Sequence, residues 1–153
     1  LGRPDAWLIG FYRRELAEGT LTEAEARVAG LTVGVGAEDV ATVKFCVENG
    51  VLPDYWVLAF HSLDYPAATL PQRCNNIWCT DPKAAADCMK TRPEPWVAIR
   101  GLAGGAINPD KAYAFARENG AAVVAIDLLD YRIVETVNAI MKKVEPDRKE
   151  ASK

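Results

Sequence analysis

Three polar side chains with chemistry suited to an enzyme site each follow an apolar segment of the chain. His61 follows YWVLAF, Arg100 follows WVAI, and Asp127 follows AVVAI. His61 is the only histidine, and its unperturbed pKa near neutrality suits proton transfer. Arg100 can hold a carboxylate or phosphate, and Asp127 can orient Arg100 or bind a cation. If the three segments are neighbouring strands, we expect these residues to form a catalytic set.

Each of these residues also has a structural interpretation. A histidine at this position can hydrogen bond within the long loop that follows it, from Ser62 to Thr80. Arg100 and Asp127 can form a structural ion pair, because buried charges are retained when they are paired. The sequence leaves both interpretations open.

A glycine-rich segment, LAGGAINP, follows the residues around Arg100 and resembles an anion-binding turn. Gly104 and Gly105 would offer backbone N–H groups, and Asn108 would begin a helix whose N-terminus favours negative charge. Against this, the later loop carries Asp127 and Asp130, which repel a phosphate. The alternative is a tight turn in which Asn108 caps the helix.

The long loop supplies further candidates for binding. Asn75 and Asn76, together with Tyr65, can hydrogen bond a polar substrate. The sequence does not identify a cofactor. One candidate is a divalent metal ion, whose weak candidate ligands are His61, Asp64, Cys74, Cys79 and Asp127. The spacing between Cys74 and Cys79 is not typical of zinc sites, and free cysteines are usually small buried apolar residues.

The elements that would position these residues alternate between strand and helix. The expected strands are Leu31 to Val35, Tyr55 to Phe60, Trp96 to Leu102 and Ala122 to Leu128, and the expected helices are Glu38 to Glu48, Pro82 to Lys90, Pro109 to Asn119 and Ile133 to Val144. Continuous apolar strands that alternate with amphipathic helices predict a parallel sheet covered by helices. Residues 1–30 are expected to be helical, residues 31–144 to hold the four strand-helix units, and residues 145–153 to be a polar, flexible tail.

The composition of the two strand faces favours a barrel over a doubly wound sheet. Alternation places Trp56, Leu58 and Phe60 on a bulky apolar face. The other face is smaller, carries Ala98, and ends in His61, Arg100 and Asp127. A barrel has a helix-facing outside and a narrower inside whose C-terminal mouth forms the site. We therefore expect the C-terminal half of a (βα)8 TIM barrel, with a flavodoxin-like domain as the alternative.

The order of motifs resembles the second half of a set of uncharacterised bacterial TIM-barrel proteins. The resemblance is carried by GVGAEDVATVKFCVENGVLPDYWVLAFHS, NNIWCTDP and PWVAIRGLAGGAINPDKAYAFARENGAAVVAIDLLD, about three quarters of the chain. It implies a His at the end of the sixth strand, a Trp-Cys before the sixth helix, and a basic residue in the seventh strand. That residue is usually lysine, so Arg100 is a departure, and a guanidinium does not form an imine with a carbonyl substrate. More distantly, the pattern resembles sugar-isomerase-like and aldolase-like barrels.

Composition and charge exclude several classes of protein. The chain has 153 residues, half of them apolar, and 18 Lys and Arg against 21 Asp and Glu, which excludes a disordered chain and predicts no nucleic-acid partner. No apolar run approaches the roughly 20 residues of a membrane span. The chain opens with Leu1 and shows no signal segment, so we expect a fragment, cytoplasmic by default.

Together these features predict an enzyme of lyase, aldolase or isomerase type that acts on a small oxygenated, carboxylated or phosphorylated metabolite. Four strands of a barrel leave two open edges, so we expect the missing N-terminal half or a second copy as a partner. One alternative is a non-catalytic fragment or small-molecule-binding module with an incomplete site. Another is a TIM-barrel oxidoreductase of the aldo-keto reductase type, since such enzymes can hold a nicotinamide without a glycine-rich fingerprint.

Overall fold

The computed structural model describes residue 30, residues 32–69 and residues 75–150, with side chains described as far as residue 142. The chain divides into two compact units, Leu1–Gly34 and Val35–Lys153. Nearly all of the first unit, including the helical segment expected within residues 1–30, lies outside the described residues, as does Cys74. The account below concerns the second unit and the strand that leads into it.

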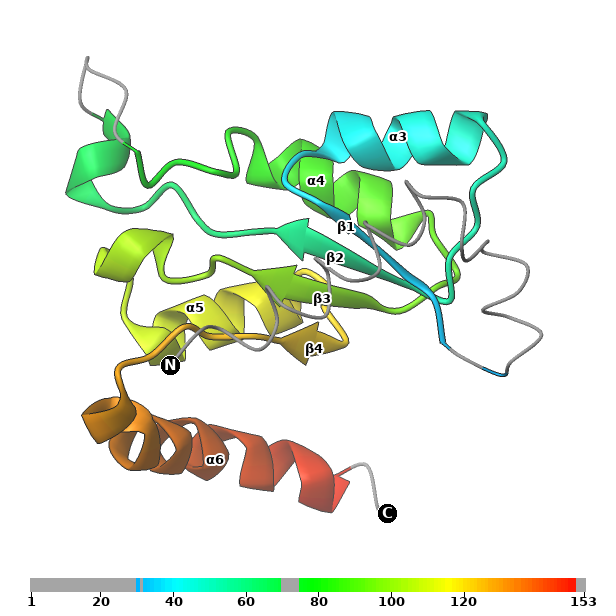
Figure 1. The fold of residues 1–153 in the computed structure, drawn as a ribbon. Helices are drawn as coiled ribbons and strands as arrows, with labels where there is room; N and C mark the ends of the chain where they lie inside the picture. Colours follow the sequence, from blue (N-terminus) through cyan, green and yellow to red (C-terminus); the bar gives the residue numbers. More distant parts are fainter. Residues whose placement is uncertain (1–29, 31, 70–74, 151–153) are drawn as a thin grey trace. The chain divides into compact units, whose positions relative to one another are not determined.

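Strands and helices alternate along the described chain, as Figure 1 shows. The strands are β1 (Gly34–Ala37), β2 (Tyr55–Ala59), β3 (Trp96–Ile99) and β4 (Val123–Val124). The α-helices are α3 (Val40–Glu48), α4 (Pro82–Lys90), α5 (Pro109–Glu118) and α6 (Ile133–Glu150), and short 3-10 turns form η1 (Pro66–Thr69), η2 (Ala103–Gly105) and η3 (Asp130–Arg132). The α/β class and the four-stranded parallel sheet expected from the sequence are confirmed.

The sheet has the strand order β1-β2-β3-β4, so each strand lies beside its predecessor in the chain. The β2–β3 and β3–β4 pairs are parallel, with Trp56 opposite Trp96 and Val97 opposite Val123. Because parallel crossovers are right-handed, strands added always in one direction place their helices on the same face. The order of these four strands does not reverse, so the described sheet lacks the switch point that the flavodoxin-like alternative requires.

One apolar core confirms that three helices cover a single face of the sheet. Its buried members come from the strands and their flanks and from α3, α4 and α5: Ala37, Val43, Trp56, Leu58, Phe60, Cys79, Ala85, Ala86, Met89, Trp96, Ala98, Ala116 and Ala121. The phenyl ring of Phe60 meets the Trp96 ring edge-on, with centroids 5.2 Å apart, and stacks on Phe115 of α5 at 5.1 Å. On the opposite face Val57, Val97 and Ile99 are only partly buried, and Val123 is 54% exposed.

The register corrects one expectation about the strand faces. Ala98 lies opposite Leu58 and is fully buried in the helix-covered core, so it does not belong to the smaller face with Ala59. The sequence misplaced it because alternation within one strand gives no register relative to the next strand. Arg100 then leaves the alternation altogether, since its backbone has a positive φ of 62°.

All four strands differ in their bounds from the expected ones, and β2 differs only in ending one residue earlier, at Ala59. β1 begins and ends later than expected. The next helix begins after Asp39, whose carboxylate accepts the Thr42 N–H at 2.8 Å. That hydrogen bond also lowers the pKa of Asp39. β3 stops at Ile99, because the positive φ of Arg100 turns the chain. β4 consists of Val123 and Val124 alone, which lie opposite Val97 and Ala98.

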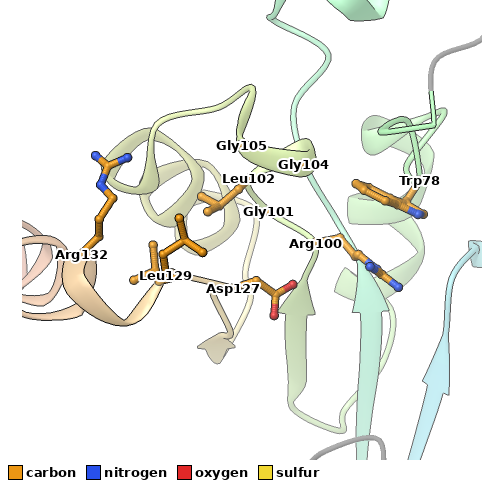
Figure 2. Close-up of a pocket in the computed structure, with 10 residues that line it drawn as sticks. Trp78, Arg100, Gly101, Leu102, Gly104, Gly105, Asp127, Leu129 and Arg132 are labelled. Atoms are coloured by element: carbon orange, nitrogen blue, oxygen red, sulfur yellow. The ribbon is translucent and has the colours of Figure 1, made fainter. Parts of the chain in front are cut away.

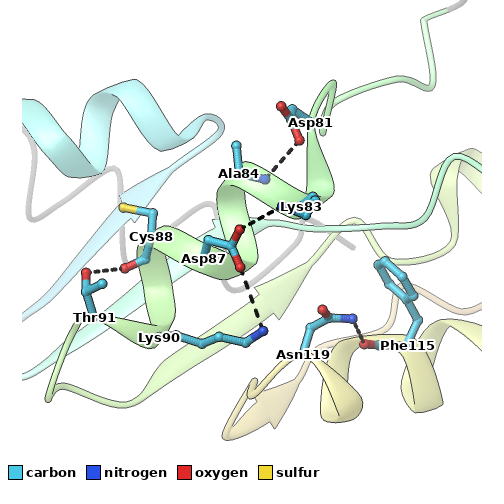
Figure 3. A network of polar contacts seen from close by, with 9 residues as sticks. All are labelled: Asp81, Lys83, Ala84, Asp87, Cys88, Lys90, Thr91, Phe115 and Asn119. Atoms are coloured by element: carbon cyan, nitrogen blue, oxygen red, sulfur yellow. Dashed lines mark hydrogen bonds and ion pairs between the residues drawn. The ribbon is translucent and has the colours of Figure 1, made fainter.

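Side-chain caps fix the helix ends, as Figure 3 shows for α4 and α5. The Asp81 carboxylate accepts the Ala84 N–H at 2.8 Å at the start of α4, and the Thr91 hydroxyl donates to the Cys88 carbonyl at its end. Asn119 Nδ2 donates to the Phe115 carbonyl at 2.8 Å, and Asn49 does the same for Phe45 at the end of α3. Asn49 and Asn119 therefore end their helices in the same way, and the glycine that follows each of them has a positive φ.

The last helix is longer than expected. α6 runs to Glu150, so residues 145–150 of the expected flexible tail are helical. The residues after Val144 are mostly charged helix formers, and Pro146 removes one backbone donor without ending the helix. Among the described residues, no helix combines the length and apolar character needed to cross a bilayer.

The core predicts a contrast between two leucines. Leu58 is fully buried, whereas Leu52 is 57% exposed. Leu58→Ala should lower the free energy of unfolding by about 2–5 kcal/mol, because it leaves a cavity between β2 and the helices. Leu52→Ala should change it by less than about 0.5 kcal/mol. Denaturant unfolding followed by circular dichroism measures both, and equal effects would contradict this core.

Candidate functional site

The loop between β2 and α4 packs onto the loop between β3 and α5. Tyr65 of the first loop is buried in one apolar cluster with Ala103, Ile107 and Ala112. The Tyr65 hydroxyl donates to the main-chain oxygen of Asn76 at 3.2 Å, and Asn76 Nδ2 donates to the Ala103 carbonyl at 3.0 Å. The two loops thus form one packed layer beyond the C-terminal ends of β2 and β3.

His61 connects this layer to the end of β2 through hydrogen bonds. The residue is 1% exposed, and its Nε2 lies 3.1 Å from the Trp78 N and 3.0 Å from the Cys79 N. Since both neighbours are N–H donors, Nε2 must be the unprotonated acceptor. Nδ1 then carries the proton and donates to the Ser62 carbonyl at 2.9 Å. Both ring nitrogens are therefore occupied by main-chain groups.

This geometry gives His61 the structural role that the sequence left as an alternative. Burial lowers the pKa of His61, although the Ser62 carbonyl opposes the shift, so the imidazole stays neutral near pH 7. His61 is not among the residues that line the neighbouring pocket. Because neither ring nitrogen is free in this arrangement, His61 cannot perform the proton transfer expected for it.

Arg100 packs on the ring of Trp78, whose main-chain N–H donates a hydrogen bond to His61. The Arg100 guanidinium carbon lies 4.8 Å from the centre of the Trp78 ring, a cation–π distance. Arg100 Nη2 is also 3.5 Å from a carboxylate oxygen of Glu38, which precedes α3. The ion pair expected with Asp127 is not the one that forms. Because β3 turns at Arg100, the side chain is directed toward Trp78 and Glu38 instead.

Arg100 and Asp127 nevertheless line the same pocket, shown in Figure 2. The cavity measures about 320 Å³ and lies at the C-terminal ends of β3 and β4. It is lined by Trp78, Arg100, Gly101, Leu102, Gly104, Gly105, Asp127, Leu128, Leu129 and Arg132. Four of the residues expected at the site, Arg100, Asp127, Gly104 and Gly105, are therefore brought together.

The two glycines differ from the expected anion-binding turn. The Gly105 N–H donates to the Leu102 carbonyl at 2.9 Å, so it closes a turn and is not offered to a ligand. Gly104 has a φ of 69°, and a Cβ there would come within 3.3 Å of the Asn76 Cβ. Glycine at position 104 thus allows the two loops to approach each other, which is a packing role as well as a conformational one.

The three asparagines expected to bind substrate lie outside the pocket lining. Asn75 is exposed, and Asn76 holds the two loops together through the bond described above. Asn108 is the N-cap residue of α5, as the alternative predicted, but its side chain makes no capping bond. Its main-chain oxygen accepts the Ala112 N–H at 2.9 Å.

The candidate metal ligands do not converge within the described part of the chain. No group of three or more His, Cys, Asp and Glu side chains is placed there to hold a metal ion. His61 Nε2 is occupied by N–H donors, and Asp64 is exposed. Burial raises the pKa of the Cys79 thiol, which opposes the thiolate that a metal or a nucleophilic reaction needs.

Sequence reasoning missed four residues of this region. Trp78, Glu38, Leu129 and Arg132 were not singled out as site residues. Arg132 could have been found, since it follows the last strand by a few residues and such loops form the mouth of parallel α/β folds. Glu38 gave no signal, because its contact with Arg100 spans 62 residues of sequence.

Comparisons of the chain with models of protein families, with curated proteins and with solved structures found no match.

The geometry of His61 predicts a pH dependence of stability. Unfolded His61 protonates near pH 6.5, whereas burial holds its pKa lower in the folded protein, so the unfolded state binds more protons between these values. The free energy of unfolding should therefore be greatest above that window and fall as the pH is lowered from about 7.5 to about 5.5.

Denaturant unfolding across this pH range, with His61→Gln as the comparison, measures the effect. The variant should be less stable at the upper pH, because two buried N–H groups lose a well-placed acceptor, and it should depend less on pH. Identical slopes for the two proteins would show that His61 is not held neutral.

Proposed function

We propose that this chain forms the C-terminal half of a (βα)8-type enzyme and that the Arg100 pocket is its substrate site. The strand order and the placement of α3, α4 and α5 on one face support a barrel segment. The partly exposed opposite face, with Val57, Val97 and Val123, would be the barrel interior. The N-terminal half of a barrel, or a second copy of this chain, would complete it.

The ligand in this proposal is a small carboxylated or phosphorylated metabolite. The observation that carries it is the Arg100 guanidinium, which stacks on Trp78 and is 32% exposed beside a pocket at the strand ends. A guanidinium that keeps donors accessible binds a carboxylate or phosphate by paired hydrogen bonds. Glu38 is the competing anion, but it is 67% exposed and its 3.5 Å contact is weak, so a bound anion can displace it.

The reaction in this proposal is of the lyase or isomerase type. Asp127 is the carboxylate that lines the pocket, which makes it the group placed to take a proton from the substrate carbon beside a carboxylate or carbonyl. The electron pair left on carbon would move to the neighbouring oxygen. Arg100 would stabilise the negative charge that develops there. Return of the proton to a different carbon, or departure of a leaving group, completes the two reaction types.

A non-catalytic binding module is the second candidate. It is favoured by the occupation of both His61 nitrogens, which removes the side chain best suited to proton transfer near neutral pH. The two candidates share the ligand and differ in whether Asp127 moves a proton.

Charge variants at the two ends of the Arg100–Glu38 pair should change anion binding in opposite directions. Arg100→Gln should weaken binding of acetate and of inorganic phosphate about tenfold or more, because a charged donor is lost. Glu38→Gln should strengthen binding a few-fold by removing the competing carboxylate. Isothermal titration calorimetry measures both effects.

Matched controls for this experiment lie outside the pocket. Arg92 borders a groove between α3 and α4, and Glu48 is exposed at the end of α3. Arg92→Gln and Glu48→Gln should leave anion binding unchanged. If Arg92→Gln weakens binding as much as Arg100→Gln does, the anion is held by net charge and not by this pocket.

Asp127→Asn separates the enzyme from the binding module. The protein is incubated in D2O with a panel of small hydroxy and oxo acids, and loss of C–H signals is followed by proton NMR. An enzyme of the proposed type exchanges a carbon-bound proton of its substrate, and Asp127→Asn should reduce that rate at least about 100-fold while anion binding persists. Binding without exchange of any panel member would favour the binding module.

A further inference from the structure

The turn that follows β3 contains three consecutive main-chain donors that the fold does not use. The Ala103 N–H donates to the Arg100 carbonyl at 3.0 Å, which closes a four-residue turn. Within the part of the chain that the structure describes, no hydrogen bond is found for the main-chain N–H groups of Arg100, Gly101 and Leu102. Gly101 is buried, and an unpaired donor in a buried residue is uncommon in proteins.

The same three residues line the pocket. Figure 2 shows Arg100, Gly101 and Leu102 following one another where β3 ends. The donors that come later in the same loop are already paired, since the N–H groups of Gly105 and Ile107 both donate to the Leu102 carbonyl. The unused donors of this loop therefore lie at its beginning, and not at the two glycines where the sequence predicted an anion site.

The backbone conformation of the turn explains why these donors can act together. Arg100 has a left-handed φ of 62°, whereas Gly101 is not among the residues with positive φ. Leu102 has a φ of −79° and a ψ of −5°, which are the angles of the third residue of a type I turn. A left-handed residue followed by right-handed ones turns successive N–H groups toward one side and forms an anion-binding concavity, called a nest. Uncommon backbone angles of this kind often occur at functional sites.

We propose that the main-chain N–H groups of Arg100, Gly101 and Leu102 bind one oxyanion of the ligand, a carboxylate or phosphate group. This inference rests on the proposed function and adds the main-chain donors to the guanidinium of Arg100. Hydrogen bonds to an ionised oxygen are stronger than those to a neutral one, and the positive charge is carried by the first residue of the same turn. In the proposed reaction, these donors stabilise the oxygen on which negative charge develops.

Nuclear magnetic resonance of the uniformly ¹⁵N-labelled chain tests the donors directly. The protein is titrated with acetate and, separately, with inorganic phosphate, and the anion that binds more tightly identifies the preferred oxyanion. The amide proton signals of Arg100, Gly101 and Leu102 should move downfield together, with one dissociation constant. Gly105 is the matched control, because it lines the same pocket but its N–H is already bonded to the Leu102 carbonyl. Its signal should move less.

Two variants at position 100 separate the backbone from the guanidinium. Both Arg100→Asn and Arg100→Val remove the charge, but asparagine tolerates a left-handed φ and valine does not. Arg100→Val should therefore bind the anion about tenfold more weakly than Arg100→Asn, because the nest is lost. The downfield shifts at Gly101 and Leu102 should persist in Arg100→Asn alone. Thermal unfolding confirms that each variant is folded, and if Arg100→Val is not, the titration of the unchanged chain decides.

The outcomes separate this inference from the proposed function. If an anion binds and Arg100→Gln weakens it, but the three amide signals move no more than that of Gly105, the guanidinium alone holds the anion. The nest is then wrong and the proposed site stands. Equal binding by folded Arg100→Asn and Arg100→Val would also overturn the nest. If neither acetate nor phosphate binds, both proposals are wrong.

Discussion

The pocket depends on one buried acceptor, the Nε2 atom of His61. It receives the N–H groups of two consecutive residues, Trp78 and Cys79, and so ties the far end of a long loop to the end of β2. Buried polar groups of this kind specify a single arrangement, because each unmet donor would cost free energy. With Trp78 held, its ring can carry the Arg100 guanidinium, and one wall of the pocket is complete. A residue outside the pocket thus determines its geometry.

The backbone of Arg100 is the second determinant. A non-glycine residue with a φ of 62° is uncommon, and here it ends β3 and rotates the side chain toward Trp78 and Glu38. The pocket lies just beyond this turn, at the ends of β3 and β4. Asp127 lines the same space together with Arg100.

Much of the fold was predictable because local sequence patterns determine it. Apolar runs, Asn-Gly helix ends and capping aspartates each act within a few residues, and the structure places α4 at the expected residues. The register between strands was not predictable, and this misplaced Ala98. Nor was α6 expected to continue to Glu150, since its last turns lack an apolar pattern.

The candidate site was also predictable only in part. Arg100, Asp127, Gly104 and Gly105 line one pocket, because parallel strands end at one edge of the sheet, and this proximity could be predicted from the order of the strands. The role of His61 could not be read from its position, since the atoms that occupy its ring are main-chain N–H groups, which every residue has. Trp78 and Glu38 were missed because their contacts with Arg100 join segments far apart in the sequence.

The most direct test of this account is the tautomer of His61, measured by long-range proton–nitrogen NMR at pH 7. The chain has a single histidine, so its two ring nitrogens give an unambiguous pair of signals. The account predicts a neutral ring with the proton on Nδ1 and an unprotonated, hydrogen-bonded Nε2. A proton on Nε2, or a ring that titrates freely near its ordinary pKa, would contradict it, because Nε2 could not then accept the Trp78 and Cys79 N–H groups.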